Sequence, residues 1–172
     1  MKKFGGPAIC LDRSDINTDE IIPAKYLTEI TKTALQPYML EDLNLEGFDP
    51  HSEKMQTAEV VVTRANFGCG SSREHAVWVF EVNKINTVIA ESFARIFRQN
   101  MFNCGMLAIE LPKEDIDTIF SLGDDITISV AVEKGKLTAK GNRDVTFDFE
   151  LHTFDKELVM AGGWLAYADA KY

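Results

Sequence analysis

The sequence is poor in cysteine, in basic residues and in long apolar runs. Its 172 residues include only Cys10, Cys69 and Cys104, with no C-x-x-C pair, so neither a disulfide framework nor a metal site built by this chain alone is expected. No stretch approaches the roughly 20 apolar residues of a membrane span, and Lys2 and Lys3 precede no run of signal-peptide length. We therefore expect a cytoplasmic protein with free thiols and no membrane partner.

The charge balance is acidic, with 18 Lys and Arg against 27 Asp and Glu and a net charge of −9. Such a chain repels phosphate backbones, which argues against a nucleic-acid partner. Residues 64–104 reverse the sign, because five basic residues there outnumber three acidic ones. The basic residues are Arg64, Arg73, Lys84, Arg95 and Arg98. A positive island in an acidic protein indicates a small anionic substrate.

Apolar and charged fractions of 45% and 26% are those of an ordinary globular protein, and the length suits one domain over residues 1–172. Apolar, β-branched runs predict strands at 8–11, 60–62, 87–90 and 106–111, with helices at 71–82 and 92–103 between the later strands. This alternation is typical of βαβ units and predicts an α/β fold with a mainly parallel sheet flanked by helices. We expect Ser71 or Ser72 and Ser92 to cap the helices, and Gly105 to end the second.

The last third changes character. Strands are expected at 125–132, 136–140 and 145–151, joined in part by a Lys134-Gly135 turn, and these form an antiparallel, β-rich C-terminal part. A final helix is expected over 155–170, although it contains Gly162-Gly163. Earlier in the chain, a helix is expected over 30–43, where Pro37 is a potential break, followed by an exposed excursion over 44–57.

A glycine-rich turn carries the clearest chemical signal, in the segment Asn66–Ala76 (NFGCGSSREHA) between a predicted strand and a predicted helix. Gly68 and Gly70 permit positive φ, and the helix N-terminus attracts anions. Arg73 adds a planar fork that matches a carboxylate, and Ser71 and Ser72 supply hydroxyls. The spacing fits no P-loop, Rossmann fingerprint or nucleophile elbow. On spacing alone, an anion site and a plain βα turn with a serine cap remain equal alternatives.

Two further segments are open to a structural or a functional interpretation. Asp19, in the polar loop before Ile21, is either a charge at a helix N-terminus or an active-site carboxylate. His75 lies one helical turn after Ser71, but no third group is evident to orient a Ser/His pair, so a packing role is favoured.

Together, the segments Asn17–Pro23 (NTDEIIP), Asn66–Ala76 and Glu91–Phe97 (ESFARIF) resemble the small, swivelling subunit of the aconitase superfamily. Within it, the resemblance is to the small subunits of 3-isopropylmalate dehydratases. The resemblance implies a swivelling β/β/α domain that closes over a separate large subunit, which carries a [4Fe–4S] cluster. No cofactor is then expected on this chain.

The resemblance also implies roles for individual residues. Ser71 would be the base that removes a proton from the carbon next to a carboxylate. Ser72 and Arg73 would hold substrate carboxylate oxygens, and Asp19 would line the site. From the residues themselves we also expect Thr18 and Lys25 to bind substrate, and Gly68 and Gly70 to form the anion loop. These roles suit the chemistry, because proton removal places charge on the carboxylate beside Arg73.

One departure from the family's pattern bears on which substrate to expect. Citrate-handling members carry an arginine shortly after the Thr-Asp motif, whereas this chain reads Pro23–Thr28 (PAKYLT), with no arginine. A less cationic pocket favours an alkyl-substituted malate, contacted by a loop over 29–39, although Lys25 could reach a distal carboxylate. We expect a hydro-lyase subunit that interconverts 2- and 3-isopropylmalate in leucine biosynthesis. The alternatives are a homoaconitate, citramalate or 2,3-dimethylmalate dehydratase subunit, or a non-catalytic anion-binding module.

Overall fold

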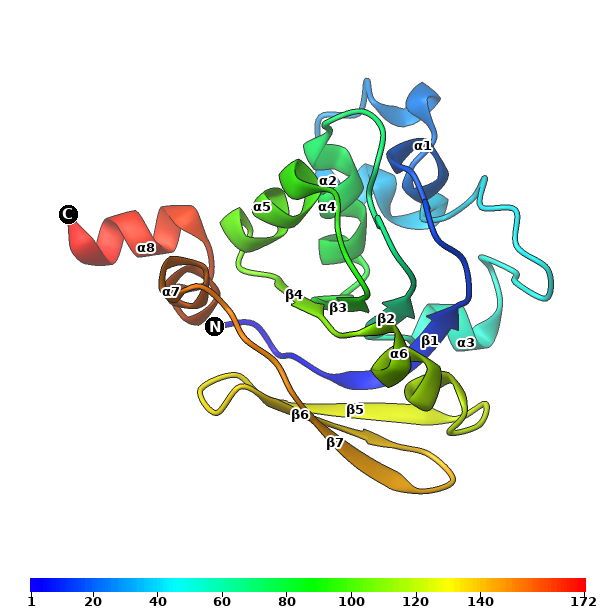
Figure 1. Cartoon of the computed structure of the whole chain (residues 1–172). Coiled ribbons are helices and arrows are strands. Elements are labelled where there is room, and N and C mark those ends of the chain that lie inside the picture. The colour runs from blue at the N-terminus through cyan, green and yellow to red at the C-terminus, as the bar shows by residue number, and fades with distance from the viewer.

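The computed structural model describes all 172 residues, which build one mixed sheet of seven strands (Figure 1). The strands are β1 (Gly6–Leu11), β2 (Val60–Thr63), β3 (Thr87–Ala90), β4 (Leu107–Glu110), β5 (Ile126–Ala131), β6 (Lys136–Lys140) and β7 (Asp144–Asp148). Their order is β4-β3-β2-β1-β5-β6-β7. Strands β1 to β4 pair in parallel, and β5, β6 and β7 continue antiparallel from β1. The expected parallel sheet with an antiparallel C-terminal part is confirmed.

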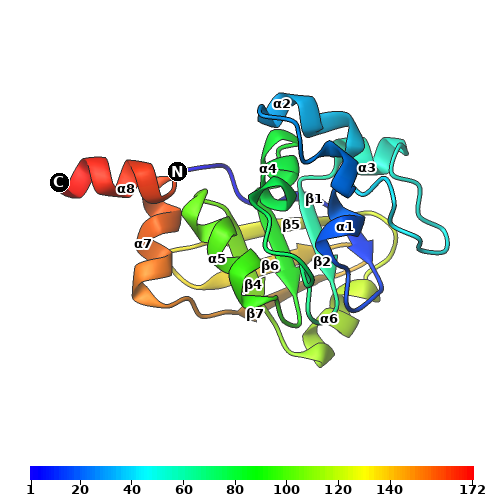
Figure 2. The same cartoon turned by 90° about the horizontal axis from the view of Figure 1, so that it is seen from above.

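Strands β2 and β3 are buried along their whole length. Helices α4 (Glu74–Val82) and α5 (Arg95–Asn103) lie on one side of the parallel strands, and the antiparallel strands pass on the other side (Figures 1 and 2). Covering on both faces explains why the strand sequences are continuous apolar runs with no polar alternation. By contrast, β5 alternates buried and exposed residues, as an antiparallel strand with one solvated face does.

The remaining helical segments have three to nine residues each. They are α1 (Thr18–Ile21), the 3-10 turn η1 (Ala24–Tyr26), α2 (Lys32–Leu35), the 3-10 turn η2 (Gln36–Tyr38), α3 (Glu53–Thr57), α6 (Lys113–Phe120), α7 (Thr153–Ala161) and α8 (Trp164–Lys171). None of the helices combines the length and the apolar character that crossing a membrane requires.

The expected starts of α4 and α5 were wrong by three residues. The N-cap residues are Arg73 and Ala94, and neither forms a side-chain capping hydrogen bond. Ser71 and Ser72 lie in the turn before α4. The Ser92 hydroxyl instead accepts a hydrogen bond from the backbone N–H of Asn66 at 2.8 Å. The serines expected to cap these helices therefore lie in the loops before them. Ser92 connects the loop after β3 to the loop after β2 through its hydrogen bond with Asn66.

The expected C-terminal helix over 155–170 was also wrong, because it is two helices. Gly162 and Gly163 adopt φ angles of 96° and 117°, which end α7 and start α8 in a new direction. A Cβ on Gly105 would fall 2.6 Å from the carbonyl oxygen of Gly162. The break thus lets the α7–α8 junction approach the end of α5 closely.

The helix expected over 30–43 was wrong as well. It is replaced by the single-turn α2 and by η2, in which Pro37 occupies an early position. The segment 44–57 is an excursion, but it ends in α3, whose Met55 is buried against the core. Helix α6 was not expected, although Ile116 and Ile119 carry its buried face.

The parallel pairing sets the position of the site. In the register, Leu11 lies opposite Thr63, and Val62 lies opposite Ile89. The carboxyl ends of β1, β2 and β3 therefore meet at one edge of the sheet, where ligands of open parallel sheets bind. The loops that leave this edge are the three segments that carry the resemblance.

Candidate active site

The first two of these loops are joined by backbone hydrogen bonds. The N–H of Gly68 donates to the carbonyl of Ile16 at 2.8 Å, and the N–H of Thr18 donates to the carbonyl of Cys69 at 2.9 Å. Asn17 and Cys69 form an isolated parallel bridge. The glycine-rich turn is therefore held against the start of α1 by main-chain contacts.

The second and third loops are joined in the same way. The N–H of Phe67 donates to the carbonyl of Ser92 at 3.1 Å, and the N–H of Ala94 donates to the carbonyl of Phe67 at 2.9 Å. Phe67 is buried and its ring meets that of Phe97 edge to face, with centroids 5.5 Å apart. One buried residue thus fixes the turn against the beginning of α5.

The two glycines of the turn serve different purposes. Gly68 is buried at φ +82°, and a Cβ there would lie 2.6 Å from Cδ1 and 2.7 Å from Cβ of Phe97. Its close neighbour is thus a core side chain, whereas the sequence led us to expect a ligand there. Gly70 is exposed at φ +94°, with Asn17 and Thr18 in ordinary contact distance. Gly70 therefore gives the turn its left-handed bend at the surface.

A cavity of about 240 Å³ opens between this turn and the start of α5. Six of its lining residues were expected as site residues, namely Thr18, Gly68, Gly70, Ser71, Ser72 and Arg73. The other four open α5 and were not expected, namely Ala94, Arg95, Ile96 and Phe97. The signal that could have found them is topological, because neighbouring parallel strands send the helices that follow them to the same edge.

The cavity is cationic. Arg73 lines it and donates to the carboxylate of Asp19, whose side chain is 61% exposed while that of Arg73 is 19% exposed. Arg95, the first residue of α5, forms no ion pair. The beginnings of α4 and α5 add the positive ends of two helix dipoles. The wall is thus suited to a carboxylate, and in this structure one of its two arginines is already paired with the Asp19 carboxylate.

Only part of the positive segment 64–104 contributes to this wall. Arg64 pairs with Asp12 and Asp117, and Arg98 pairs with Glu110 at 3.1 Å. These arginines are neutralised at the surface, so the local anion preference rests on Arg73 and Arg95.

Helix α1 is only one turn long and is fixed by side chains. Asn17 and Glu20 form a reciprocal capping box, in which the Asn17 side chain accepts from the N–H of Glu20 at 3.0 Å. Both carboxylate oxygens of Glu20 also accept from the guanidinium of Arg13. That hydrogen-bonded pairing holds the pKa of Glu20 below its ordinary value. The Thr18-Asp19 pair is therefore presented from a rigid turn.

Two candidates lie elsewhere. Lys25 is exposed in η1, with its Nζ 5.2 Å from the centre of the Tyr26 ring, and it does not line the cavity. His75 does not pair with Ser71, because its Nε2 lies 3.2 Å from the carbonyl oxygen of Glu29 and its ring lies beside Trp78. The structure therefore brings neither side chain to the serines.

The chain's own residues do not fit an iron–sulfur cluster. Its three cysteines are free, and no group of three or more His, Cys, Asp or Glu side chains comes together as metal ligands do. Burial raises the pKa of Cys10 and of Cys104 to about 11, and raises that of Cys69, so these thiols are held protonated at neutral pH.

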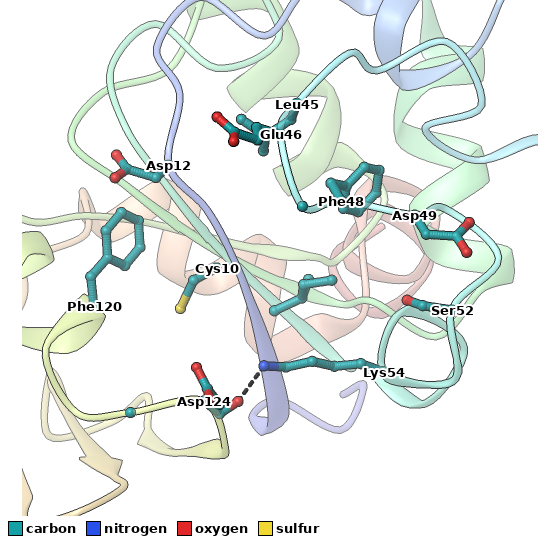
Figure 3. A pocket seen from close by; sticks show the side chains of 13 residues that line it. Cys10, Asp12, Leu45, Glu46, Phe48, Asp49, Ser52, Lys54, Phe120 and Asp124 are labelled. Carbon is teal, nitrogen blue, oxygen red and sulfur yellow. Dashed lines mark hydrogen bonds between the residues drawn. The ribbon is translucent and has the colours of Figure 1, made fainter.

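A larger cavity, of about 470 Å³, lies between the end of β1, the loop before α3 and the loop after α6 (Figure 3). Four acidic side chains line it, namely Asp12, Glu46, Asp49 and Asp124. Its one basic side chain, Lys54, donates to the backbone carbonyl of Asp124 (Figure 3). This lining repels carboxylates, so the smaller cavity is the candidate active site.

Known proteins are similar to this chain in sequence and in fold. Residues 2–114 match the family model for the aconitase C-terminal domain. A 3-isopropylmalate dehydratase small subunit from Deinococcus deserti is 38% identical over 160 residues, covering 92% of this chain and 83% of the relative. A protein of the same name from Leptospira interrogans is 35% identical over 176 residues, covering 94% of this chain and 85% of the relative.

Among solved structures, 3-isopropylmalate dehydratase from Methanocaldococcus jannaschii superposes with a TM-score of 0.80 at 30% sequence identity. The match covers 97% of this chain and 93% of the other. Sequence and fold agree, and the chain belongs to the family of 3-isopropylmalate dehydratase small subunits, within the aconitase superfamily.

Proposed function

We propose that this chain is the small subunit of a hydro-lyase that interconverts 2-isopropylmalate and 3-isopropylmalate in leucine biosynthesis. The observation that carries the proposal is the cavity that unites Ser71, Ser72 and Arg73 in a chain of this family. The reaction needs a base beside a carboxylate and a cation to hold that carboxylate. The cavity supplies both kinds of group.

Ser71 is the proposed base. As its alkoxide, Ser71 takes the proton from the carbon next to a substrate carboxylate and becomes a hydroxyl. The electron pair of the broken C–H bond moves toward that carboxylate and then forms the alkene double bond as the neighbouring C–O bond breaks and the substrate hydroxyl departs. Arg73 and the N–H of the turn stabilise this developing charge more than they stabilise the ground state, which lowers the barrier. Ser72 donates its hydroxyl to a carboxylate oxygen. Arg73 exchanges the Asp19 carboxylate for that of the substrate.

A serine hydroxyl is a poor base in water, and Ser71 and Ser72 are exposed in the isolated chain. We propose that a large subunit closes over this face, excludes water and strengthens every electrostatic interaction in the cavity. The [4Fe–4S] cluster belongs, in this proposal, to that large subunit, in keeping with the scattered thiols of this chain.

The placement of Lys25 favours an alkyl-substituted malate. A substrate with a third carboxylate, such as homoaconitate, needs a cation that reaches its distal end. Lys25 is exposed and lies beside Tyr26, outside the cavity lining. The pocket therefore offers two carboxylate-binding arginines and an apolar side formed by Ala94, Ile96 and Phe97.

The substrate is tested on the holoenzyme. The chain is reconstituted anaerobically with its large subunit, and alkene absorbance is followed with 2-isopropylmalate, 3-isopropylmalate, citrate, homocitrate, citramalate and dimethylmalate. We expect the isopropylmalates to give the highest kcat/KM. Faster turnover of citrate or homocitrate would contradict the assignment.

The role of Ser71 is tested by Ser71→Ala, with Ser129→Ala as an exposed control on β5. Loss of a general base typically costs about 10²–10⁴-fold in kcat, and substrate binding should persist. Wild-type turnover by Ser71→Ala would remove Ser71 from the mechanism, and equal losses in both variants would point to a failure of assembly.

A further inference from the structure

Thr18 is one of only three buried polar side chains in the chain, the others being Thr63 and Thr87. Its side chain is 2% exposed, although its neighbour Asp19 is 61% exposed. A buried hydroxyl without a partner is costly, so its hydrogen bond defines what it does.

The hydrogen bond of Thr18 is made to Ser71, the proposed base. The Thr18 hydroxyl donates to the backbone carbonyl of Ser71 at 3.0 Å, and the Thr18 N–H donates to the carbonyl of Cys69 at 2.9 Å. One residue thus holds the two carbonyls on either side of Gly70. A Cβ on Gly70 would lie 3.5 Å from the Thr18 hydroxyl oxygen, so the turn passes directly over Thr18.

The donor count limits what Thr18 can do for a substrate. A hydroxyl has one proton to donate, and a carboxylate only accepts. Because the Thr18 proton is used by the Ser71 carbonyl, it is not free for a substrate carboxylate. This conflicts with the expectation that Thr18 binds substrate, even though Thr18 lines the cavity.

We infer that Thr18 is a positioning residue, whose buried hydroxyl fixes the Ser71 peptide and so directs the Ser71 side chain into the cavity. The inference rests on the proposed function, in which Ser71 is the base. Main-chain hydrogen bonds hold the turn as far as Cys69, whereas Gly70 leaves the Ser71 peptide free to rotate and no side-chain hydrogen bond holds Ser71 or Ser72. Thr18 is the side chain that opposes this freedom.

Thr18 is itself rigid enough for the task. It is the first residue of α1, directly after the Asn17 cap, and Glu20 in the same turn is held by Arg13. A chain of contacts therefore runs from the Arg13–Glu20 pair through α1 to Ser71. Displacing a reacting group by about 1 Å can cost about 100-fold in rate.

The test uses the holoenzyme and compares Thr18→Val, which keeps the shape and removes the donor, with Thr18→Ser, which keeps the donor. We expect Thr18→Val to lower kcat by about 10- to 100-fold with KM within about twofold, and Thr18→Ser to recover most of the loss. Thr18→Ala serves in place of Thr18→Val if the valine variant fails to assemble with the large subunit.

Thr63→Val is the matched control. The Thr63 side chain is fully buried, and its hydroxyl donates to the carbonyl of Leu11 at 2.8 Å, with the carbonyl oxygen of Arg13 also near at 3.2 Å; neither carbonyl belongs to the glycine-rich turn. It should lose stability comparable to Thr18→Val and keep the kcat of the assembled enzyme. The comparison separates the effect of losing any buried hydrogen-bond donor from the specific effect of losing the donor beside Ser71.

Three outcomes overturn the inference: wild-type kcat in Thr18→Val, a raised KM at unchanged kcat, or an equal fall of kcat in Thr63→Val. A raised KM alone would mean that Thr18 contacts substrate. Failure of the proposed function is seen separately, because the wild-type holoenzyme would then turn over citrate or homocitrate faster than isopropylmalate, and failure of Ser71 as the base is seen when Ser71→Ala retains turnover. If Ser71→Ala is inactive and Thr18→Val is not impaired, only the positioning role falls.

Discussion

Gly68→Ala should destabilise the subunit through two separable effects. The first is backbone strain at φ +82°, which costs an L residue about 1–2 kcal/mol. The second is overpacking, because the new Cβ would lie 2.6 Å from a ring carbon of Phe97, and forcing extra carbon into a packed core costs about 1–3 kcal/mol. Together they lower the free energy of unfolding by about 2–5 kcal/mol.

Gly47→Ala is the matched control for this prediction. Gly47 has φ +77° but nothing within 4 Å of a Cβ position, so it reports backbone strain alone. Urea unfolding of the wild type and both variants gives the two free energies and their difference, which is the overpacking cost. Equal destabilisation by the two substitutions would refute the argument that Gly68 is required by Phe97.

The remaining predictions concern charge and thiols. Arg73→Lys should lower kcat and raise KM together, by tenfold or more in kcat/KM, because an ammonium cannot reproduce the bidentate fork; wild-type steady-state kinetics would exclude Arg73 from substrate binding. Glu20→Gln should remove the stabilisation that the Arg13–Glu20 pair gives to the folded chain. That stabilisation is complete above the ordinary carboxyl pKa and is lost as pH falls through the lowered pKa of Glu20. Its stability deficit in urea should therefore be full at pH 7 and shrink below about pH 4, and a constant deficit would exclude the Arg13 pairing as its source. Iodoacetamide at pH 8 should alkylate Cys10 and Cys104 far more slowly in the folded chain than in urea, since burial raises the pKa of each to about 11; equal rates by mass spectrometry would contradict this.

The strands were the most predictable part of the fold. The run Thr87–Ala90 and the run Lys136–Lys140 match β3 and β6 residue for residue. Strand β3 is buried on both faces and is apolar throughout, whereas β6 is buried on one face and alternates. Both patterns can be recognised in a few consecutive residues.

Helix boundaries were less predictable, because the residues that set them have distant partners. Ser92 looks like a cap, but its hydroxyl is used by Asn66 in another loop. Gly162 and Gly163 look like a tolerated weakness within a helix, but their positive φ angles divide α7 from α8. Neither the distant hydrogen bond nor the helix break can be predicted from the neighbouring residues in the sequence.

The site was predictable as a set of residues and unpredictable as a geometry. The motif pointed to Ser71, Ser72 and Arg73, and the structure places all three at one cavity. The motif gave no sign that Asp19 forms an ion pair with Arg73, that Arg95 lines the same cavity, or that Thr18 is buried beneath the turn. Those facts depend on how three loops meet, which the register of the parallel strands decides.

The loop between α1 and the 44–57 excursion has a consequence for how such enzymes diverge. Its ends are closed by a hydrogen bond from the N–H of Leu40 to the carbonyl of Ile21 at 2.8 Å, and its middle by stacked rings of Tyr26 and Tyr38, 3.8 Å apart. These two contacts close the loop on itself, and further contacts attach it to α4, where His75 meets the Glu29 carbonyl and Lys32 pairs with Glu81 at 2.6 Å. None of residues 23–39 lines the cavity, so they can be exchanged between relatives without replacing any side chain around Ser71, Ser72 and Arg73. A changed preference for the substrate's side group after such an exchange would show that the loop reaches the substrate only in the closed holoenzyme.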